Sequence, residues 1–121
     1  MKKNGLLKEL IDMLHYGRED KVITEIVDSL ELIVTNEESQ KDYFKSFGSI
    51  SAMENCNIFI EKDSPLHRIY LMLTMSAIMG DDKIFHDSIE ELRLIVNKIK
   101  KLLTIDFDLA KHSLYELYSA A

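Results

Sequence analysis

The stretch Leu66-His67-Arg68-Ile69-Tyr70-Leu71-Met72-Leu73-Thr74-Met75-Ser76-Ala77-Ile78-Met79 decides the fold. Ser64 before it suits a helix cap, Pro65 suits the first helical position, and Gly80 suits the left-handed turn that ends a helix. No residue from 69 to 79 is charged. We therefore expect a central helix over about 65–79 that is buried on all sides. At roughly 22 Å it is too short to span a membrane.

The composition is that of an ordinary globular domain. The length of 121 residues predicts a single domain over 1–121. With 46% hydrophobic residues, one proline and four glycines, the chain favours helix over disorder or sheet. Cys56 is the only cysteine, which excludes an internal disulfide framework and fits a reducing compartment. Charged residues interrupt any apolar core of a signal peptide near the start, so we expect a cytoplasmic protein.

Amphipathic patterns on both sides of this stretch predict further helices. We expect five of them: between Asn4 and Gly17, over 18–35, from 37 to about 46, over 81–103 and over 106–118. In the helix over 81–103, Leu94, Ile95 and Leu102 widen the apolar stripe. The segment 49–60 is either a short helix with Ile50 and Met53 inward or an irregular crossing. Short connections make neighbouring helices antiparallel. The predicted fold is all-α, a compact antiparallel bundle of five or six helices around the central one.

Candidate metal ligands are present, but their spacing fits no known pattern. Asp82, His86 and Glu90 stand four apart on one predicted helix face. Di-metal bundles use paired Glu-x-x-His motifs, however, and no Glu here precedes a His by three. The other acid and histidine pairs, Asp12 with His15 and Asp108 with His112, do not repeat a motif. We expect no metal site, and a small helical metalloenzyme is the least favoured interpretation.

Other common sites are equally hard to find. Cys56 has no motif linking it to a base, and a lone cysteine is usually buried and inert. His67 is expected to bond backbone or solvent near a helix end. No glycine-rich phosphate loop is present. We therefore expect no catalytic residue and no cofactor.

Charge argues against nucleic acid as a direct ligand. The net charge is −6, and the only basic cluster, Lys98 to Lys101, ends a predicted helix where cations are favoured anyway. Methionine-rich surfaces serve adaptable binding proteins, but Met72, Met75 and Met79 fall in the central stretch. We expect these three to fill the core.

An acidic row is the remaining candidate site. Glu25, Asp28 and Glu31 are spaced three apart and lie nearly in line on the polar side of the second predicted helix. Such rows are more often simply solvated. A functional row would offer carboxylates to a basic protein surface, with Tyr16 and Tyr43 as aromatic anchors.

This acidic row suggests a class of function. Nuclease toxins hold polyanionic substrates in basic clefts, and a small acidic cytoplasmic protein that covers such a cleft is an immunity protein, or antitoxin. We expect this role, with a basic toxin domain as the partner and no contact with nucleic acid or membrane. The alternative is a helical adaptor, chaperone or regulatory subunit that binds an amphipathic partner helix in an apolar groove.

Overall fold

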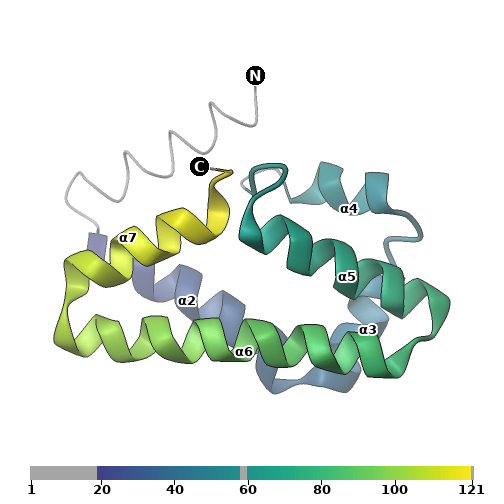
Figure 1. The fold of residues 1–121 in the computed structure, drawn as a ribbon, viewed down its shortest axis with the longest axis horizontal. Coiled ribbons are helices and arrows are strands. Elements are labelled where there is room, and N and C mark those ends of the chain that lie inside the picture. The colour runs from purple at the N-terminus through teal and green to yellow at the C-terminus, as the bar shows by residue number, and fades with distance from the viewer. Residues whose placement is uncertain (1–18, 58–59, 121) are drawn as a thin grey trace.

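The computed structural model describes residues 19–57 and 60–120. This part of the chain holds six helices and no strand (Figure 1). The helices are α2 (Glu19–Thr35), α3 (Glu37–Lys45), α4 (Ile50–Cys56), α5 (Pro65–Met79), α6 (Asp82–Ile105) and α7 (Phe107–Tyr118). The predicted all-α bundle is confirmed. The helix expected between Asn4 and Gly17 lies outside the described residues.

The helix ends follow the capping chemistry of the sequence. The Ser64 hydroxyl accepts a hydrogen bond from the backbone N–H of His67, and Pro65 is the first residue of α5. Gly80 ends α5 with φ of 76°, a conformation in which a residue with a Cβ is strained. Asp81 caps α6 and Asp106 caps α7 through their carboxylates. These caps fix where the α5–α6 and α6–α7 connections turn.

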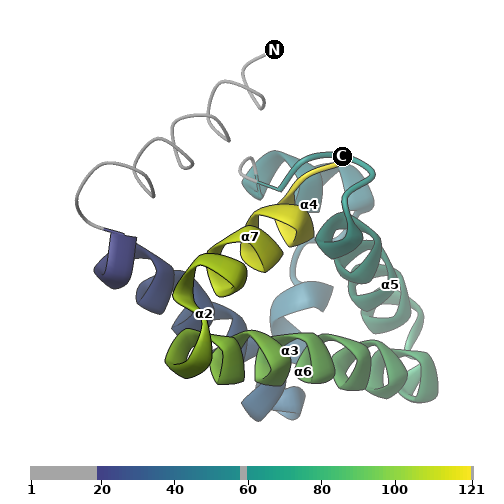
Figure 2. The same cartoon turned by 60° about the vertical axis from the view of Figure 1, so that its left-hand side comes forward.

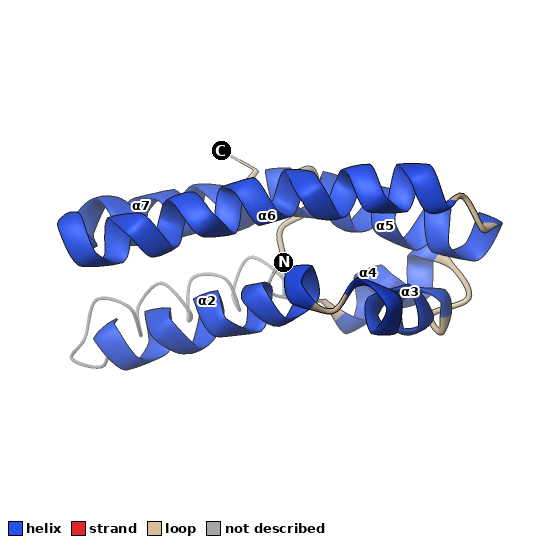
Figure 3. Cartoon of the chain, turned by 90° about the horizontal axis from the view of Figure 1, so that it is seen from below, coloured by secondary structure: helices blue, strands red, loops and turns tan. Residues whose placement is uncertain are grey.

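The helices form two layers around one core. Figure 3 shows α5, α6 and α7 on one side and α2, α3 and α4 on the other. The core between them combines the apolar faces of all six described helices. Its fully buried side chains include Ile23, Val27, Phe44, Met53, Leu66, Leu73, Phe85, Ile89, Leu92, Ile99 and Leu114. Because α6 contacts α2, α3, α5 and α7, it joins the two layers along its length.

The expectation that the central helix is buried on all sides is wrong. The inner face of α5, which includes Leu66 and Leu73, is fully buried against its neighbours. On its outer face no helix among the described residues covers the side chains. There Met72, Met75, Ile78 and Met79 expose 42, 44, 38 and 74% of their surface. The prediction that the three methionines fill the core is therefore wrong as well.

The middle segment and α6 test two further predictions from the sequence. Residues 50–56 form a helix, which decides between the two interpretations of the middle segment, and Met53 is buried as predicted. On α6 the predicted stripe from Phe85 to Ile99 is buried, but Leu94, expected to widen it, is 70% exposed. Leu94 projects from the side of α6 opposite the core.

The layer of α5, α6 and α7 is not evenly packed. Figures 1 and 2 both show α7 diverging from α6 as the two helices leave their common corner. The end of α7 lies beside the segment before α5, where the Glu61 N–H donates to the Tyr118 carbonyl over 2.9 Å. The Glu61 carboxylate in turn accepts from the Ala120 N–H at 2.8 Å. The far end of α7 is thus held near the start of α5 rather than near α6.

Candidate protein-binding surfaces

The predicted acidic row lies on α2 but is only partly free. Glu25 and Asp28 are exposed, and neither forms an ion pair with another described residue. Glu31 is half-buried and pairs with Lys100 of α6. This ion pair holds α2 against α6, so Glu31 already has an intramolecular partner. Two of the three predicted carboxylates remain available to another molecule.

The predicted aromatic anchors do not join this row. Tyr16 lies outside the described residues. Tyr43 is on α3, where its ring packs edge-on against Phe44 and Phe47 with centroid distances of 5.2 and 5.1 Å. Partial burial and the nearby Cys56 raise the pKa of its phenol. No ring contact, hydrogen bond or ion pair between described residues links Tyr43 to the α2 carboxylates, so the structure does not assemble one site from them.

The candidate metal ligands on α6 have other partners. Nδ1 of His86 lies 3.0 Å from a carboxylate oxygen of Glu37, at the start of α3. Glu90 pairs with Arg93, and Asp82 lies 3.3 Å from Nζ of Lys41. Arg93 also donates to the carbonyl of Val34 at 2.6 Å. These contacts tie α6 to α2 and α3.

No described group of three His, Cys, Asp or Glu side chains is arranged to hold a metal ion. At the end of the chain, His112 is exposed and lies 3.4 Å from Glu116, and it forms no ion pair with Asp108. The pair Asp12 and His15 falls outside the described residues. The polar contacts on α6 and α7 are therefore those of ordinary ion pairs between and within helices.

His67 has a structural role that the sequence only partly indicated. Its side chain is 4% exposed, and its Nδ1 accepts a hydrogen bond from the Asp63 N–H at 3.0 Å. With Nδ1 as the acceptor, Nε2 carries the proton and donates to the Glu54 carboxylate at 2.7 Å. The backbone bond agrees with the expectation, whereas the link to α4 through Glu54 was not foreseen. This imidazole fixes the turn before α5 and holds α4 to it.

Cys56 and Thr74 offer no site of their own. Cys56 is exposed at the end of α4, so the expectation of a buried thiol is wrong. No described base and orienting group are placed to activate it. The Thr74 hydroxyl is buried on the inner side of α5 and has no hydrogen-bond partner among the described residues. It lines neither of the hollows described below.

An apolar surface at the α5–α6 turn is the feature that sequence reasoning missed. It consists of the exposed side chains of Met72, Met75 and Met79 on α5 and Ile84 on α6, here named the methionine patch. With Ser76 and Asp81 these side chains line a hollow of about 120 Å³. The methionines stand at i, i+3 and i+7, the spacing of one helix face. That spacing is visible in the sequence. The lack of charged residues around the methionines, however, favoured the prediction that they lie in the core.

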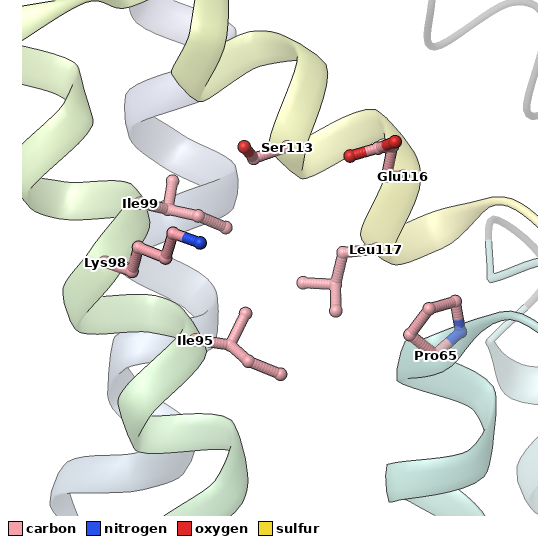
Figure 4. Close-up of a pocket in the computed structure, with 7 residues that line it drawn as sticks. All are labelled: Pro65, Ile95, Lys98, Ile99, Ser113, Glu116 and Leu117. Atoms are coloured by element: carbon pink, nitrogen blue, oxygen red, sulfur yellow. The ribbon is translucent and has the colours of Figure 1, made fainter.

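A second hollow lies where α7 diverges from α6. Ile95, Ile99 and Leu117 give it an apolar floor, and Pro65 at the start of α5 closes one side. Figure 4 shows the Lys98 and Glu116 side chains extending toward it from α6 and α7, with Ser113 between them. Its volume is about 240 Å³ and it is widely open to solvent. Small-molecule sites are usually larger, about 300–1,000 Å³, and enclose most of their ligand. The hollow is thus suited to a single side chain of a larger partner.

Charges differ between the two hollows. Asp81 lines the hollow of the methionine patch, whereas the other aspartates at the start of α6 have partners: Asp82 lies 3.3 Å from Lys41 and Asp87 lies 3.1 Å from Lys83. At the second hollow Lys98 is exposed and forms no ion pair with another described residue. Asp81 is thus the carboxylate at the methionine patch, whereas the second hollow presents Lys98 together with Glu116, whose carboxylate lies 3.4 Å from His112.

In comparisons with protein-family models, with curated proteins and with solved structures, no match to this chain was found. Within residues 19–57 and 60–120, none of the helices combines the length and the apolar character needed to cross a bilayer. The chemistry of the surface is therefore the guide to function.

Proposed function

We propose that this protein is a small binding domain, an adaptor or regulatory subunit, whose methionine patch binds the apolar face of an amphipathic partner helix. The observation that carries the proposal is the exposure of Met72, Met75 and Met79 in a single row beside Ile84. Apolar residues scattered singly over a surface are normal. A contiguous row at a hollow is characteristic of protein-binding surfaces, where methionine is enriched.

The chemistry of methionine supports a helical partner. Its unbranched thioether side chain adapts to differently shaped apolar side chains, and Met-rich surfaces recur in proteins that bind varied amphipathic helices. Full burial of one such side chain contributes about 1.5–3 kcal/mol. Met79 alone exposes 74% of its surface, so a partner that covers it gains much of this value. Weighted by their exposed fractions, the three methionines together contribute about 2–5 kcal/mol, so other contacts with the partner must supply the rest of the roughly 8 kcal/mol that micromolar binding requires.

The charge of the protein favours a basic partner. The net charge is −6, and the carboxylate of Asp81 lines the hollow of the patch. A helix with a lysine or arginine beside its apolar face pairs with this carboxylate. The partner chemistry is therefore an apolar stripe flanked by cations.

The test uses a defined probe, a fluorescently labelled amphipathic peptide of about 18 leucine and lysine residues, with binding followed by anisotropy. We expect the double variant Met75→Gln/Met79→Gln to bind the peptide at least tenfold more weakly, because about 1.4 kcal/mol of apolar burial is lost. Leu94→Gln is the matched control, since Leu94 is equally exposed on α6 but lies outside the patch. Absence of binding by the wild type, or equal weakening by both variants, would disprove the proposal.

The toxin-inhibitor role is a second candidate, and one observation favours it. Glu25 and Asp28 are exposed on α2, in line, and unpaired with any other described residue. Free carboxylates in a row suit the basic cleft of a nuclease, and they increase the association rate more than the final affinity.

The two roles predict different responses to mutation. For an inhibitor, Glu25→Lys/Asp28→Lys abolishes capture of a basic nuclease from the native host, and the association rate of the purified pair falls as salt concentration rises. For a helix-binding adaptor, this variant keeps its partner and Met75→Gln/Met79→Gln loses it. A nuclease activity assay on the captured protein then decides whether inhibition occurs.

A further inference from the structure

The methionine patch and the second hollow lie on the same face of the molecule. Ile84 lines one hollow and Ile95 the other, and these residues are eleven positions apart on α6. Eleven residues make slightly more than three helical turns, so both side chains project from the same side of α6. On α5, Pro65 lines the second hollow and Met79 lines the hollow of the methionine patch. These two residues are fourteen positions apart, which is close to four helical turns, so they lie on the same side of α5.

The two hollows are therefore the ends of a single path along the line where α5 and α6 contact each other. The rise between Ile84 and Ile95 is about 16 Å. Arg68 of α5 and Glu91 of α6 are exposed along this path, and neither forms an ion pair with another described residue. The path thus runs from an apolar hollow past two free charges to another apolar hollow.

We infer that one partner helix occupies this whole path, with apolar anchor residues eleven positions apart that enter the two hollows. This inference rests on the proposed function and specifies the partner. A helix of about three turns spans the distance with the same periodicity as α6, so both anchors fall on one of its faces. Between the anchors it carries an acidic and a basic residue that pair with Arg68 and Glu91.

Charge also gives the direction of the partner. The positive N-terminal end of a helix is attracted to carboxylates, and its negative C-terminal end to cations. The carboxylate at the methionine end of the path is Asp81, and the cation at the other end is Lys98, beside Glu116, whose carboxylate lies 3.4 Å from His112. The start of α5, also at this second end, adds a positive helix terminus. The partner helix therefore runs antiparallel to α5, with its N-terminus at the methionine patch.

Synthetic peptides test the spacing. Three alanine-rich helical peptides of the same length and charge carry two leucines eleven positions apart, two leucines nine positions apart, or one leucine. Nine positions place the second leucine on the opposite face of the helix. We expect the first peptide to bind the full-length protein at least tenfold more tightly than the other two, because only it buries a second anchor.

Variants of the protein locate the second anchor. Ser113→Phe fills the second hollow from its rim, and Lys98→Glu reverses the free cation there. We expect each to remove the advantage of the first peptide while leaving the binding of the one-leucine peptide unchanged. Lys45→Glu makes the same charge change on an exposed residue of α3, in the other layer, and should leave the advantage intact. Circular dichroism confirms that each variant is folded.

The outcomes separate this inference from the proposed function. If the first and third peptides bind equally well and Met75→Gln/Met79→Gln still weakens both, the inference fails and the proposed function stands. If no peptide binds, both fail. Sedimentation that reveals a dimer which the methionine variant dissociates would assign the path to a second copy of this chain and overturn the inference.

Direction is measured separately. A nitroxide at the N-terminus of the first peptide should broaden the amide NMR signals of residues 82–84 and spare those of 113–117. The reverse pattern would overturn the assigned direction.

Discussion

The helices α5 and α6 pack against each other, yet the sequence predicts one far better than the other. On α6 charged residues alternate with apolar ones, and the predicted stripe from Phe85 to Ile99 is buried. On α5 no residue from 69 to 79 is charged, and four side chains of that uncharged stretch are nevertheless exposed. The helix that looked more suited to the centre of the domain therefore has four exposed apolar side chains.

This difference teaches how charge and burial are related. A charged residue almost always faces solvent, because burying it without a partner is costly. An uncharged residue has no such restriction, and much of the surface of any folded protein is apolar. Charges on α6 thus identify its outer side, whereas their absence on α5 leaves the outer side undetermined.

The largest expected effects come from the inner faces, where the two helices should behave alike. Leu73 of α5 and Leu92 of α6 are both fully buried in the same core. We expect Leu73→Ala and Leu92→Ala each to lower the free energy of unfolding by about 2–5 kcal/mol, through lost apolar burial and the cavity left behind. Urea denaturation followed by circular dichroism measures this. A loss below about 1 kcal/mol at Leu73 alone would mean that α5 is loosely packed on its inner side as well.

A smaller effect is expected where α5 begins. His67→Ala removes the acceptor of the Asp63 N–H and the donor to Glu54, both in a mostly buried position. We expect a loss of about 1–3 kcal/mol in the free energy of unfolding, since two polar groups lose their partner. His112→Ala on α7, where the side chain is exposed, should change stability by less than about 0.5 kcal/mol. Equal effects at the two histidines would show that the His67 bonds do not stabilise the start of α5.

Local chemistry determined what the sequence could predict. The residues that begin and end the helices act through their immediate neighbours, so the helix ends could be predicted from the sequence. These residues are Ser64, Pro65, Gly80, Asp81 and Asp106. Contacts between distant parts of the chain could not be predicted in this way. The pairing of Glu31 with Lys100 spans 69 residues and the pairing of Glu37 with His86 spans 49, and no local pattern indicates either.

The methionine patch was missed for the same reason. Whether a helix face is covered depends on where the other helices lie, and here α3, α4, α6 and α7 pack against the inner side or the edges of α5. The spacing of Met72, Met75 and Met79 gave their common face, but not whether that face points inward. For the acidic row, the sequence placed Glu25, Asp28 and Glu31 on one helix but could not show that Glu31 pairs with Lys100.

The smallest effect is expected on the outer faces and is the sharpest test of the comparison. Met79 of α5 and Leu94 of α6 are exposed to a similar degree, 74 and 70%. Met79→Gln and Leu94→Gln should each change the free energy of unfolding by less than about 0.5 kcal/mol, because little apolar surface leaves the core. A loss of more than about 1 kcal/mol for Met79→Gln would mean that residues of this chain cover the patch, and the proposed partner site would then be an internal contact. If the free energy of unfolding does not change, the exposed methionines do not stabilise the fold. Binding to a partner would then be the remaining physical reason for so much apolar surface in one place.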